Sequence, residues 1–124
     1  AMEIIDSRYK NFRFSLEDVV ADNASSSSFV VGPWCRPDSN LENLGMILEF
    51  NGRPVQIGSS AAILGHPVRS LVSAARLATE SEERIEAGWI IMAGGATAAE
   101  ALYPNINVRN TVEGLGALAF NVTS

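Results

Sequence analysis

Basic residues are scarce in this sequence, which carries 9 lysines and arginines against 14 aspartates and glutamates, for a formal net charge of -5. Lys10 is the only lysine. Proteins that bind nucleic acid concentrate positive charge where the phosphate backbone lies. We therefore expect no nucleic-acid partner.

Cysteine and long apolar runs are also nearly absent. The single cysteine, Cys35, cannot form a disulfide within the chain, so we expect a reducing, cytoplasmic location. No apolar run reaches the roughly 20 residues of a membrane-spanning helix, and no basic-then-apolar signal segment opens the chain. We therefore expect no membrane partner.

Apolar residues, in contrast, are plentiful: they make up 47% of the 124 residues, against 19% charged residues. A chain of this length forms one domain with a real core, so a single domain over residues 1–124 is expected. The apolar bias further suggests a surface that a partner covers. We expect the chain to self-associate as a homo-oligomer.

A β-hairpin is the strongest local prediction. Met46, Leu48 and Phe50 alternate with less apolar neighbours, as in a strand, and Asn51-Gly52 follows at once. Asn-Gly is typical of tight hairpin turns because both central positions need positive φ. The returning strand would carry Val55 and Ile57.

Two helices and five further strands complete the expected elements. Ser15 is placed to cap a short helix over 16–21, with Asp18 completing a capping box. Pro67 suits the first position of a longer helix that ends near Thr79. The remaining strands are expected at residues 3–9, 29–31, 89–92 (buried), 106–109 and 117–122. The pattern indicates an α+β fold with one main helix.

An apolar pair between two carboxylates opens the chain, as Glu3-Ile4-Ile5-Asp6, with Arg8 two residues further on. A buried carboxylate needs a cation, a metal or hydrogen-bond donors. This stretch is therefore either a metal- or substrate-binding corner or a structural pair of Asp6 and Arg8 at a strand end. The residues alone favour the structural pair.

Other conspicuous side chains have structural interpretations. We expect His66 to cap the helix that follows it, or to hydrogen-bond in its loop, because the sequence offers no partner to orient it as a general base. Trp34 and Trp89 are expected to pack against other side chains. Cys35 is expected to be a small buried or loop residue.

Five segments, in this order, resemble one family: EIIDSRY (3–9), DNASS (22–26), NG (51–52), AAILGHP (61–67) and GGAT (94–97). They resemble the 2-oxopent-4-enoate hydratases and 4-oxalocrotonate decarboxylases of the fumarylacetoacetate hydrolase superfamily. The resemblance covers nearly the whole chain, and the segment around GGAT leans toward the decarboxylases.

The resemblance implies a mixed β-roll around a metal-dependent site for a small 2-oxo acid from aromatic breakdown. A divalent ion, Mg²⁺ or Mn²⁺, would chelate and polarise the 2-oxo acid. Glu3 matches the family's metal-binding glutamate in this motif. Ser25 or Ser26 lies where the family has a substrate-contacting serine, and Thr97 lies on a loop that lines the pocket.

Family members are far longer, and their other two acidic ligands and their catalytic lysine and aspartate lie before the matched region. We therefore expect this chain to be the C-terminal part of such a lyase, a fragment or a truncated relative. The alternative, from another functional class, is a non-catalytic oligomerisation or small-molecule-binding module on the same fold.

Overall fold

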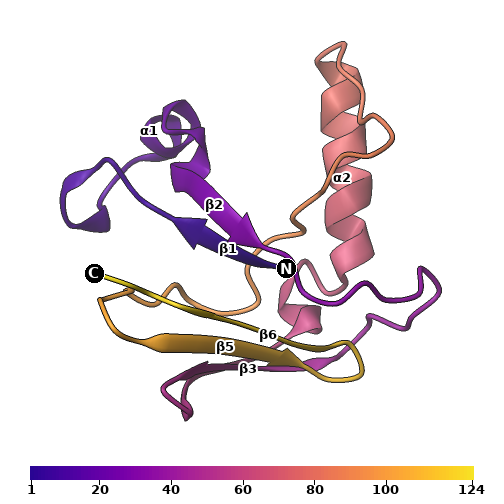
Figure 1. Cartoon of the computed structure of the whole chain (residues 1–124). Coiled ribbons are helices and arrows are strands. Elements are labelled where there is room, and N and C mark those ends of the chain that lie inside the picture. Colours follow the sequence, from indigo (N-terminus) through magenta and orange to yellow (C-terminus); the bar gives the residue numbers. More distant parts are fainter. The chain divides into compact units, whose positions relative to one another are not determined.

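The computed structural model describes all 124 residues, which form two compact units, Ala1–Gly32 and Pro33–Ser124 (Figure 1). We call them the N-terminal unit and the C-terminal unit and describe each by itself. The predicted α+β class with one main helix is confirmed, and both sheets are antiparallel. The single domain over 1–124 stays a prediction. No helix has the length and apolar character needed to cross a membrane.

The N-terminal unit is a two-stranded ribbon with a helical excursion between its strands. Strand β1 (Met2–Ile5) pairs with β2 (Ser26–Val30), and η1 (Lys10–Phe12), α1 (Leu16–Ala21) and η2 (Asn23–Ser25) lie between them in the chain. The predicted helix over 16–21 is confirmed. Its capping box is complete, because the Ser15 hydroxyl accepts from the Asp18 N–H and the Asp18 carboxylate accepts from the Ser15 N–H.

A β-bulge interrupts the pairing of β1 with β2. Glu3 lies opposite Phe29 and Ile4 opposite Ser28, but Ile5 lies opposite Ser26, so one residue of β2 is skipped. Directly before Ser26, the three residues of η2 all have positive φ, between 50° and 57°. This left-handed backbone costs a residue with a side chain roughly 1–2 kcal/mol, so other contacts must hold it.

The C-terminal unit is built on a four-stranded sheet in the order β4-β3-β5-β6. Its strands are β3 (Gly45–Phe50), β4 (Arg53–Ser59), β5 (Asn107–Val112) and β6 (Gly116–Asn121). The predicted hairpin is confirmed as β3 and β4, joined by Asn51 and Gly52 at φ of 50° and 75°. The Asn51 side chain also accepts a hydrogen bond from the Asn107 N–H at 2.8 Å, which ties the turn to β5.

The main helix, α2 (Pro67–Glu80), follows the short helix η3 (Ser60–Ala62). Pro67 occupies its first turn, and Nδ1 of His66 accepts from the Val68 N–H at 3.1 Å. Both predictions are confirmed: the helix begins at Pro67, and His66 caps it. Imidazole serves here as a cap because it presents a lone pair to an N–H that no carbonyl can reach.

The apolar core lies in the C-terminal unit. Its buried apolar side chains are Phe50, Ile63, Ile106 and Val108, and Val108 is fully buried. The ring of Phe50 meets that of Tyr103 edge-on at 6.1 Å. The core therefore joins the two central strands, β3 and β5, to the segments that flank them.

The predicted buried strand at 89–92 is wrong. These residues are irregular, and each is at least 36% exposed. Gly88 and Gly94, both at positive φ, bound the run, and β3 and β5 already have strand neighbours on both sides. A short apolar run between glycines is therefore not enough to predict a strand, because a strand also needs a neighbour to pair with.

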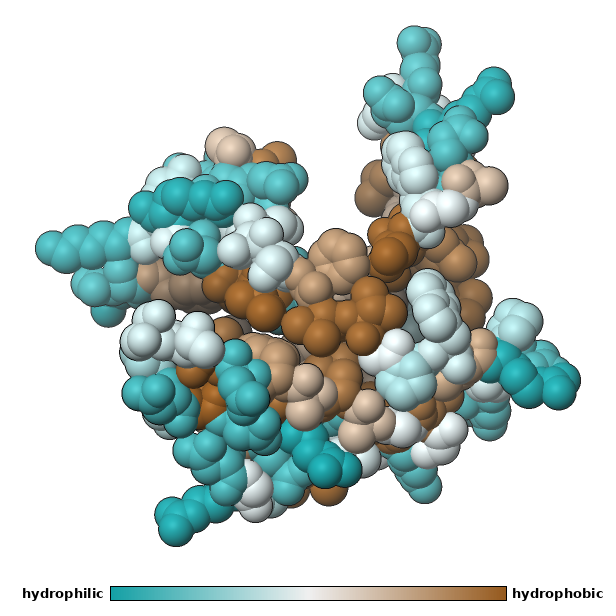
Figure 2. Space-filling model, viewed as in Figure 1, coloured by the Kyte–Doolittle hydropathy of each residue, from teal (hydrophilic) through white to brown (hydrophobic).

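The predicted packing of the tryptophans is also wrong within this chain. Trp34 is 85% exposed and Trp89 is 61% exposed. Further large apolar side chains are open along α2, where Val72 and Leu77 are more than half exposed. Figure 2 shows such apolar residues, in brown, on the surface of the molecule.

Candidate functional site

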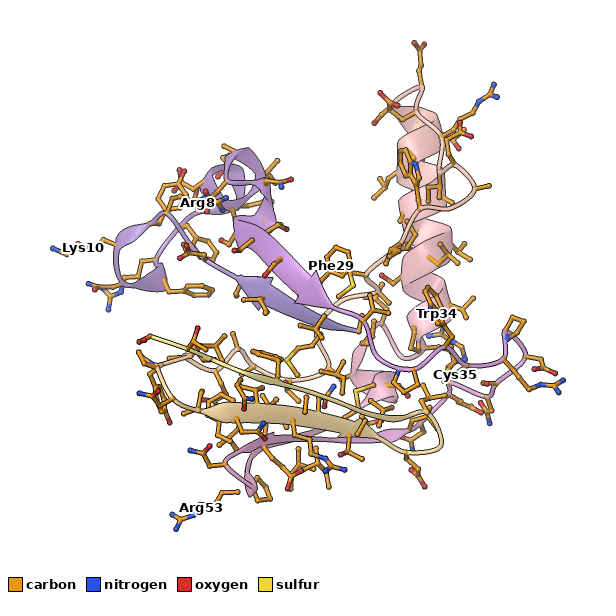
Figure 3. All side chains as sticks on the ribbon, in the orientation of Figure 1. Arg8, Lys10, Phe29, Trp34, Cys35 and Arg53 are labelled. Atoms are coloured by element: carbon orange, nitrogen blue, oxygen red, sulfur yellow. The ribbon has the colours of Figure 1, made fainter.

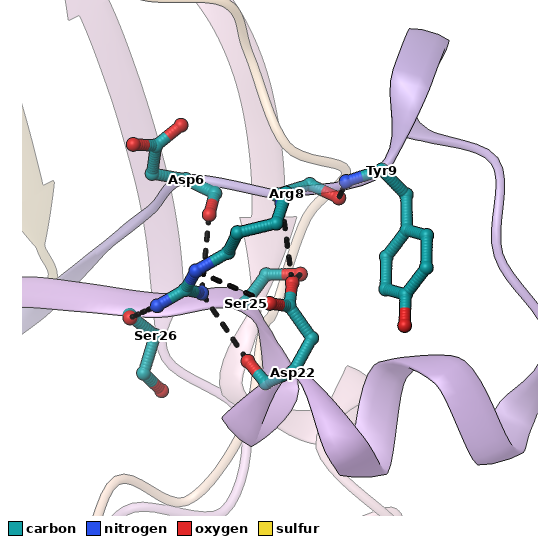
Figure 4. A network of polar contacts seen from close by, with 7 residues as sticks. Asp6, Arg8, Tyr9, Asp22, Ser25 and Ser26 are labelled. Carbon is teal, nitrogen blue, oxygen red and sulfur yellow. Dashed lines mark hydrogen bonds and ion pairs between the residues drawn. The ribbon is translucent and has the colours of Figure 1, made fainter.

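Arg8 is the centre of the polar contacts in the N-terminal unit (Figure 4). Its Nε lies 3.1 Å from Oδ1 of Asp22, and its terminal nitrogens donate to the backbone carbonyls of Asp6, Asp22 and Ser26, each at 3.2 Å. The predicted Asp6–Arg8 ion pair is therefore wrong, because Asp6 contributes only its carbonyl. The Asp6 side chain is free to be solvated, whereas the Asp22 side chain is only 8% exposed and needs the cation.

Asp22 is the residue that sequence reasoning missed as the partner of Arg8. Its Oδ2 also accepts from the Arg8 N–H at 3.3 Å and from the Ser25 hydroxyl at 3.2 Å. Several donors thus surround this nearly buried carboxylate, as its burial requires. The available signal was its place at the start of the DNASS segment, directly before the left-handed turn.

The structure brings Glu3 together with one of the two candidate serines. The Ser26 hydroxyl donates to Oε1 of Glu3 at 3.4 Å, whereas the Ser25 hydroxyl is turned to Asp22 and its side chain is buried. Glu3 is exposed. The exposed carboxylate and the hydroxyl beside it form the only pair of candidate site residues that hydrogen-bond to each other.

Tyr9, in the same unit, lies beside the carboxylates of Asp18 and Asp22. Burial raises the pKa of the Tyr9 phenol, and the negative charges of Asp18 and Asp22 raise it further. Tyr9 is therefore a neutral hydroxyl at ordinary pH. Lys10 is exposed and points away from the N-terminal unit (Figure 3).

Thr97 lies in the C-terminal unit, on the irregular segment that follows α2. Its hydroxyl donates to the Ala98 carbonyl at 3.2 Å. The segment packs on β4 at Gly58, where an added Cβ would lie 2.6 Å from both the Ala96 carbonyl oxygen and the Thr97 methyl carbon. Two residues earlier, Gln56 donates to the Glu100 carboxylate. The face of β4 that carries Gln56 and Gly58 thus holds the loop with Thr97 in place.

Cys35 is exposed on the loop that follows residue 32, near Trp34 (Figure 3). Its sulfur lies 3.6 and 3.5 Å from the carbonyl oxygens of Pro33 and Leu115, either of which can accept its single proton. This arrangement agrees with the expected loop residue.

A metal site needs more than these residues supply. No group of three or more histidine, cysteine, aspartate or glutamate side chains gathers anywhere in the chain. The carboxylate of Glu3 is a hard oxygen donor of the kind that Mg²⁺ prefers, but Mg²⁺ demands octahedral coordination and gains affinity from several charged ligands. Glu3 therefore has the chemistry of a magnesium ligand, but the residues around it do not by themselves make up a magnesium site.

Comparison with known proteins identifies the family of this fold. The family described as fumarylacetoacetate (FAA) hydrolase C-terminal matches residues 5–123. A 4-oxalocrotonate decarboxylase of Pseudomonas sp. is 61% identical over 99% of this chain and 48% of its own length. A 2-keto-4-pentenoate hydratase of Paraburkholderia xenovorans is 33% identical over 95% of this chain and 45% of its own length.

Solved structures give the same result. The 4-oxalocrotonate decarboxylase from Pseudomonas putida G7, complexed with magnesium and adipate, superposes with a TM-score of 0.91 at 43% identity over 97% of this chain and 46% of that one. The predicted fold type is thereby confirmed. The chain spans about half the length of the relatives it matches.

Proposed function

The chain belongs to the fumarylacetoacetate hydrolase C-terminal family, and from this membership we propose that it supplies one part of a metal-dependent lyase site for a small 2-oxo acid. Decarboxylation is the favoured reaction, because identity to a decarboxylase is 61% against 33% for a hydratase. The observation that carries the proposal is the hydrogen bond between Ser26 and Glu3, which joins the proposed metal ligand to a proposed substrate contact.

Each candidate residue has a role in this proposal. Glu3 supplies one carboxylate oxygen to the ion, and Ser26 orients that carboxylate and contacts the substrate. Ser25, the other candidate, has its hydroxyl bound to Asp22, so we assign it to holding the turn. Thr97 lines the substrate pocket from its loop.

A bound Mg²⁺ or Mn²⁺ would polarise the 2-oxo group and stabilise an enolate. This chain's own contribution is to hold Glu3 and orient it. A carboxylate that accepts a hydrogen bond has fewer orientations open to it, and outer partners of this kind set ligand geometry. The remaining ligands make the site composite, formed with additional polypeptide or with a second copy.

The alternative is a non-catalytic oligomerisation or binding module on the same fold. The exposed apolar side chains of Trp34, Val72 and Leu77 favour assembly with another surface. Homo-oligomer formation belongs to both proposals. Only the first requires Glu3 to bind metal.

Calorimetry with Mg²⁺, in the presence of oxalate as a mimic of the chelating 2-oxo acid, tests the proposal. We expect binding that Glu3→Ala abolishes, because the ion loses a charged ligand. Glu86→Ala is the matched control: it removes the same charge from an exposed position in the C-terminal unit and should leave binding unchanged.

Light scattering on the same samples gives the oligomeric state and shows whether binding accompanies assembly. Wild-type protein that assembles but binds no ion would exclude a metal site completed by a second copy of this chain and would favour the binding module. Equal losses in the two variants would show that general negative charge, and not Glu3, attracts the ion.

A further inference from the structure

We propose that Arg8 is a positioning residue, whose guanidinium fixes the β1–β2 register so that Ser26, out of four consecutive serines, presents its hydroxyl to Glu3. The inference rests on the proposed function of Glu3 and Ser26. Arg8 would touch neither metal nor substrate and would act through Ser26.

Because four serines follow one another, the register of β1 against β2 decides which serine faces Glu3. Residues 25–28 are all serine, and neighbouring residues of a strand point to opposite faces. Residues directly opposite each other in a sheet share a face, and Glu3 and Ile5 share one face of β1. In a regular ladder Ile5 would lie opposite Ser27, which would place the Ser27 hydroxyl on the face of Glu3 and turn Ser26 away.

The bulge places Ser26, and not Ser27, opposite Ile5. Because Ile5 pairs with Ser26, the hydroxyl of Ser26 lies on the face of Glu3 and reaches its carboxylate at 3.4 Å. A bulge is a common means of re-aiming one side chain without changing the sequence. The identity of the serine that meets Glu3 is thus set by one skipped residue.

Arg8 holds the chain next to the skipped residue, Ser27. Its guanidinium donates to the Ser26 carbonyl, and the Asp6 N–H donates to the Ser25 carbonyl at 2.8 Å. Both contacts tie the start of β2 to the chain that leaves β1. A planar guanidinium can bind several carbonyls at fixed angles, which the point charge of a lysine cannot do.

Arg8 also supports the strained turn before Ser26. The positive φ of Asn23, Ala24 and Ser25 is unfavourable for residues with side chains. Arg8 binds both the carboxylate and the carbonyl of Asp22, the residue where this turn begins. Without that anchor the turn can relax, and the serines can slip to the regular register.

Nuclear magnetic resonance on the full chain tests the register directly. In the wild type we expect cross-strand contacts between Ile5 and Ser26. In Arg8→Gln, contacts of Ile5 with Ser27 should replace them, while the Glu3–Phe29 contacts remain. Arg36→Gln is the matched control, because it removes an exposed Arg–Asp pair of 2.7–2.9 Å in the C-terminal unit and should change nothing in β1 or β2.

Binding of Mg²⁺ with oxalate gives a readout that a merely structural residue would not move. Arg8→Gln and Ser26→Ala should each weaken binding about tenfold or more, as loss of an outer partner of a metal ligand does. Ser27→Ala alone should leave Mg²⁺ binding unchanged. Combined with Arg8→Gln, in which Ser27 would face Glu3, it should weaken binding further.

Arg8→Lys is the second variant, in case Arg8→Gln unfolds the unit. Retention of the Ile5–Ser26 contacts in both variants, or unfolding of the N-terminal unit in both, would overturn the assignment of register control to Arg8. Absence of ion binding in the wild type would exclude a metal site formed by copies of this chain alone. The cross-strand contacts seen by nuclear magnetic resonance would still decide the role of Arg8.

Discussion

The two units of this chain are held by different interactions. In the C-terminal unit four apolar side chains are buried between and beside the strands of a four-stranded sheet. The N-terminal unit has no buried apolar side chain, and its one buried residue is Ser25, which hydrogen-bonds to Asp22. Apolar burial thus stabilises the larger unit, and charge-assisted hydrogen bonds organise the smaller one.

The two units also differ in what fixes the register of their strands. Apolar burial sets the register of a sheet with a buried face, because a one-residue slip would turn the buried side chains to water, but the serine run at 25–28 offers no such apolar pattern. Hydrogen bonds have preferred distances and angles, so the Arg8–Asp22 contacts can fix one serine out of four. The disadvantage is low intrinsic stability, because an isolated two-stranded ribbon is marginal in water.

Phe50→Ala should break the C-terminal unit and gives the largest effect that we predict. Phe50 is only 7% exposed, and its ring meets Tyr103 edge-on. Loss of a buried phenyl ring leaves a cavity and costs about 3–5 kcal/mol. Amide hydrogen exchange in β3 and β5 measures the fall in the free energy of opening.

Ile57→Ala is the control for this prediction. Ile57 lies on the adjacent strand β4 and is 75% exposed, so its truncation should change the free energy of opening by less than about 0.5 kcal/mol. Similar losses in the two variants would mean that the face carrying Ile57 is covered, for instance in a homo-oligomer.

Gly58→Ala should disturb the C-terminal unit at its candidate site residue, with an intermediate effect. The new methyl group would lie 2.6 Å from the Ala96 carbonyl oxygen and from the Thr97 methyl carbon. Overpacking of this kind costs about 1–3 kcal/mol and should displace the loop. Chemical shifts of residues 96–98 and the unfolding free energy check both effects.

Gly45→Ala is the matched control, because Gly45 is also a strand glycine and an added Cβ there would stay 3.5 Å from the nearest atom of Glu113. It should be tolerated. An unchanged Thr97 environment in Gly58→Ala would contradict the view that β4 positions this loop.

Local signals in the sequence predicted the elements whose chemistry is itself local. Asn51-Gly52 forms its turn because both residues accept positive φ, Ser15 and Asp18 lie at capping-box spacing, and Pro67 begins α2. None of these depends on a distant partner. The family resemblance supplied the fold type, which local patterns could not.

The errors concern contacts between residues far apart in the chain. Arg8 takes Asp22, 14 residues away, over Asp6, because the excursion through α1 returns a nearly buried carboxylate to the end of β1. The bulge at Ile5 has no signature within a run of identical serines. The apolar run at 89–92 gave a strand pattern but has no strand partner.

Ser15→Ala should weaken the N-terminal unit, with the smallest effect that we predict. It removes the hydroxyl that accepts from the Asp18 N–H and should destabilise α1 by about 1 kcal/mol, the usual cost of a lost N-cap. Because the N-terminal unit has no apolar core to absorb the loss, exchange of the α1 amides should quicken. Ser28→Ala, in β2, is the control and should leave α1 unchanged.

The same cap makes the stability of α1 depend on pH. A hydrogen bond to its own backbone N–H, and then one from the Ser15 hydroxyl, lower the pKa of Glu17 below its ordinary 4.5. A lowered pKa in the folded state stabilises the helix above the ordinary value, and the contribution is lost as pH falls through the lowered pKa. Exchange of the α1 amides should therefore quicken, relative to the intrinsic rate, as pH falls below about 4.5, and less so in Ser15→Ala. An identical pH dependence in the two proteins would show that the Ser15 hydroxyl does not hold Glu17, and that the cap acts through Asp18 alone.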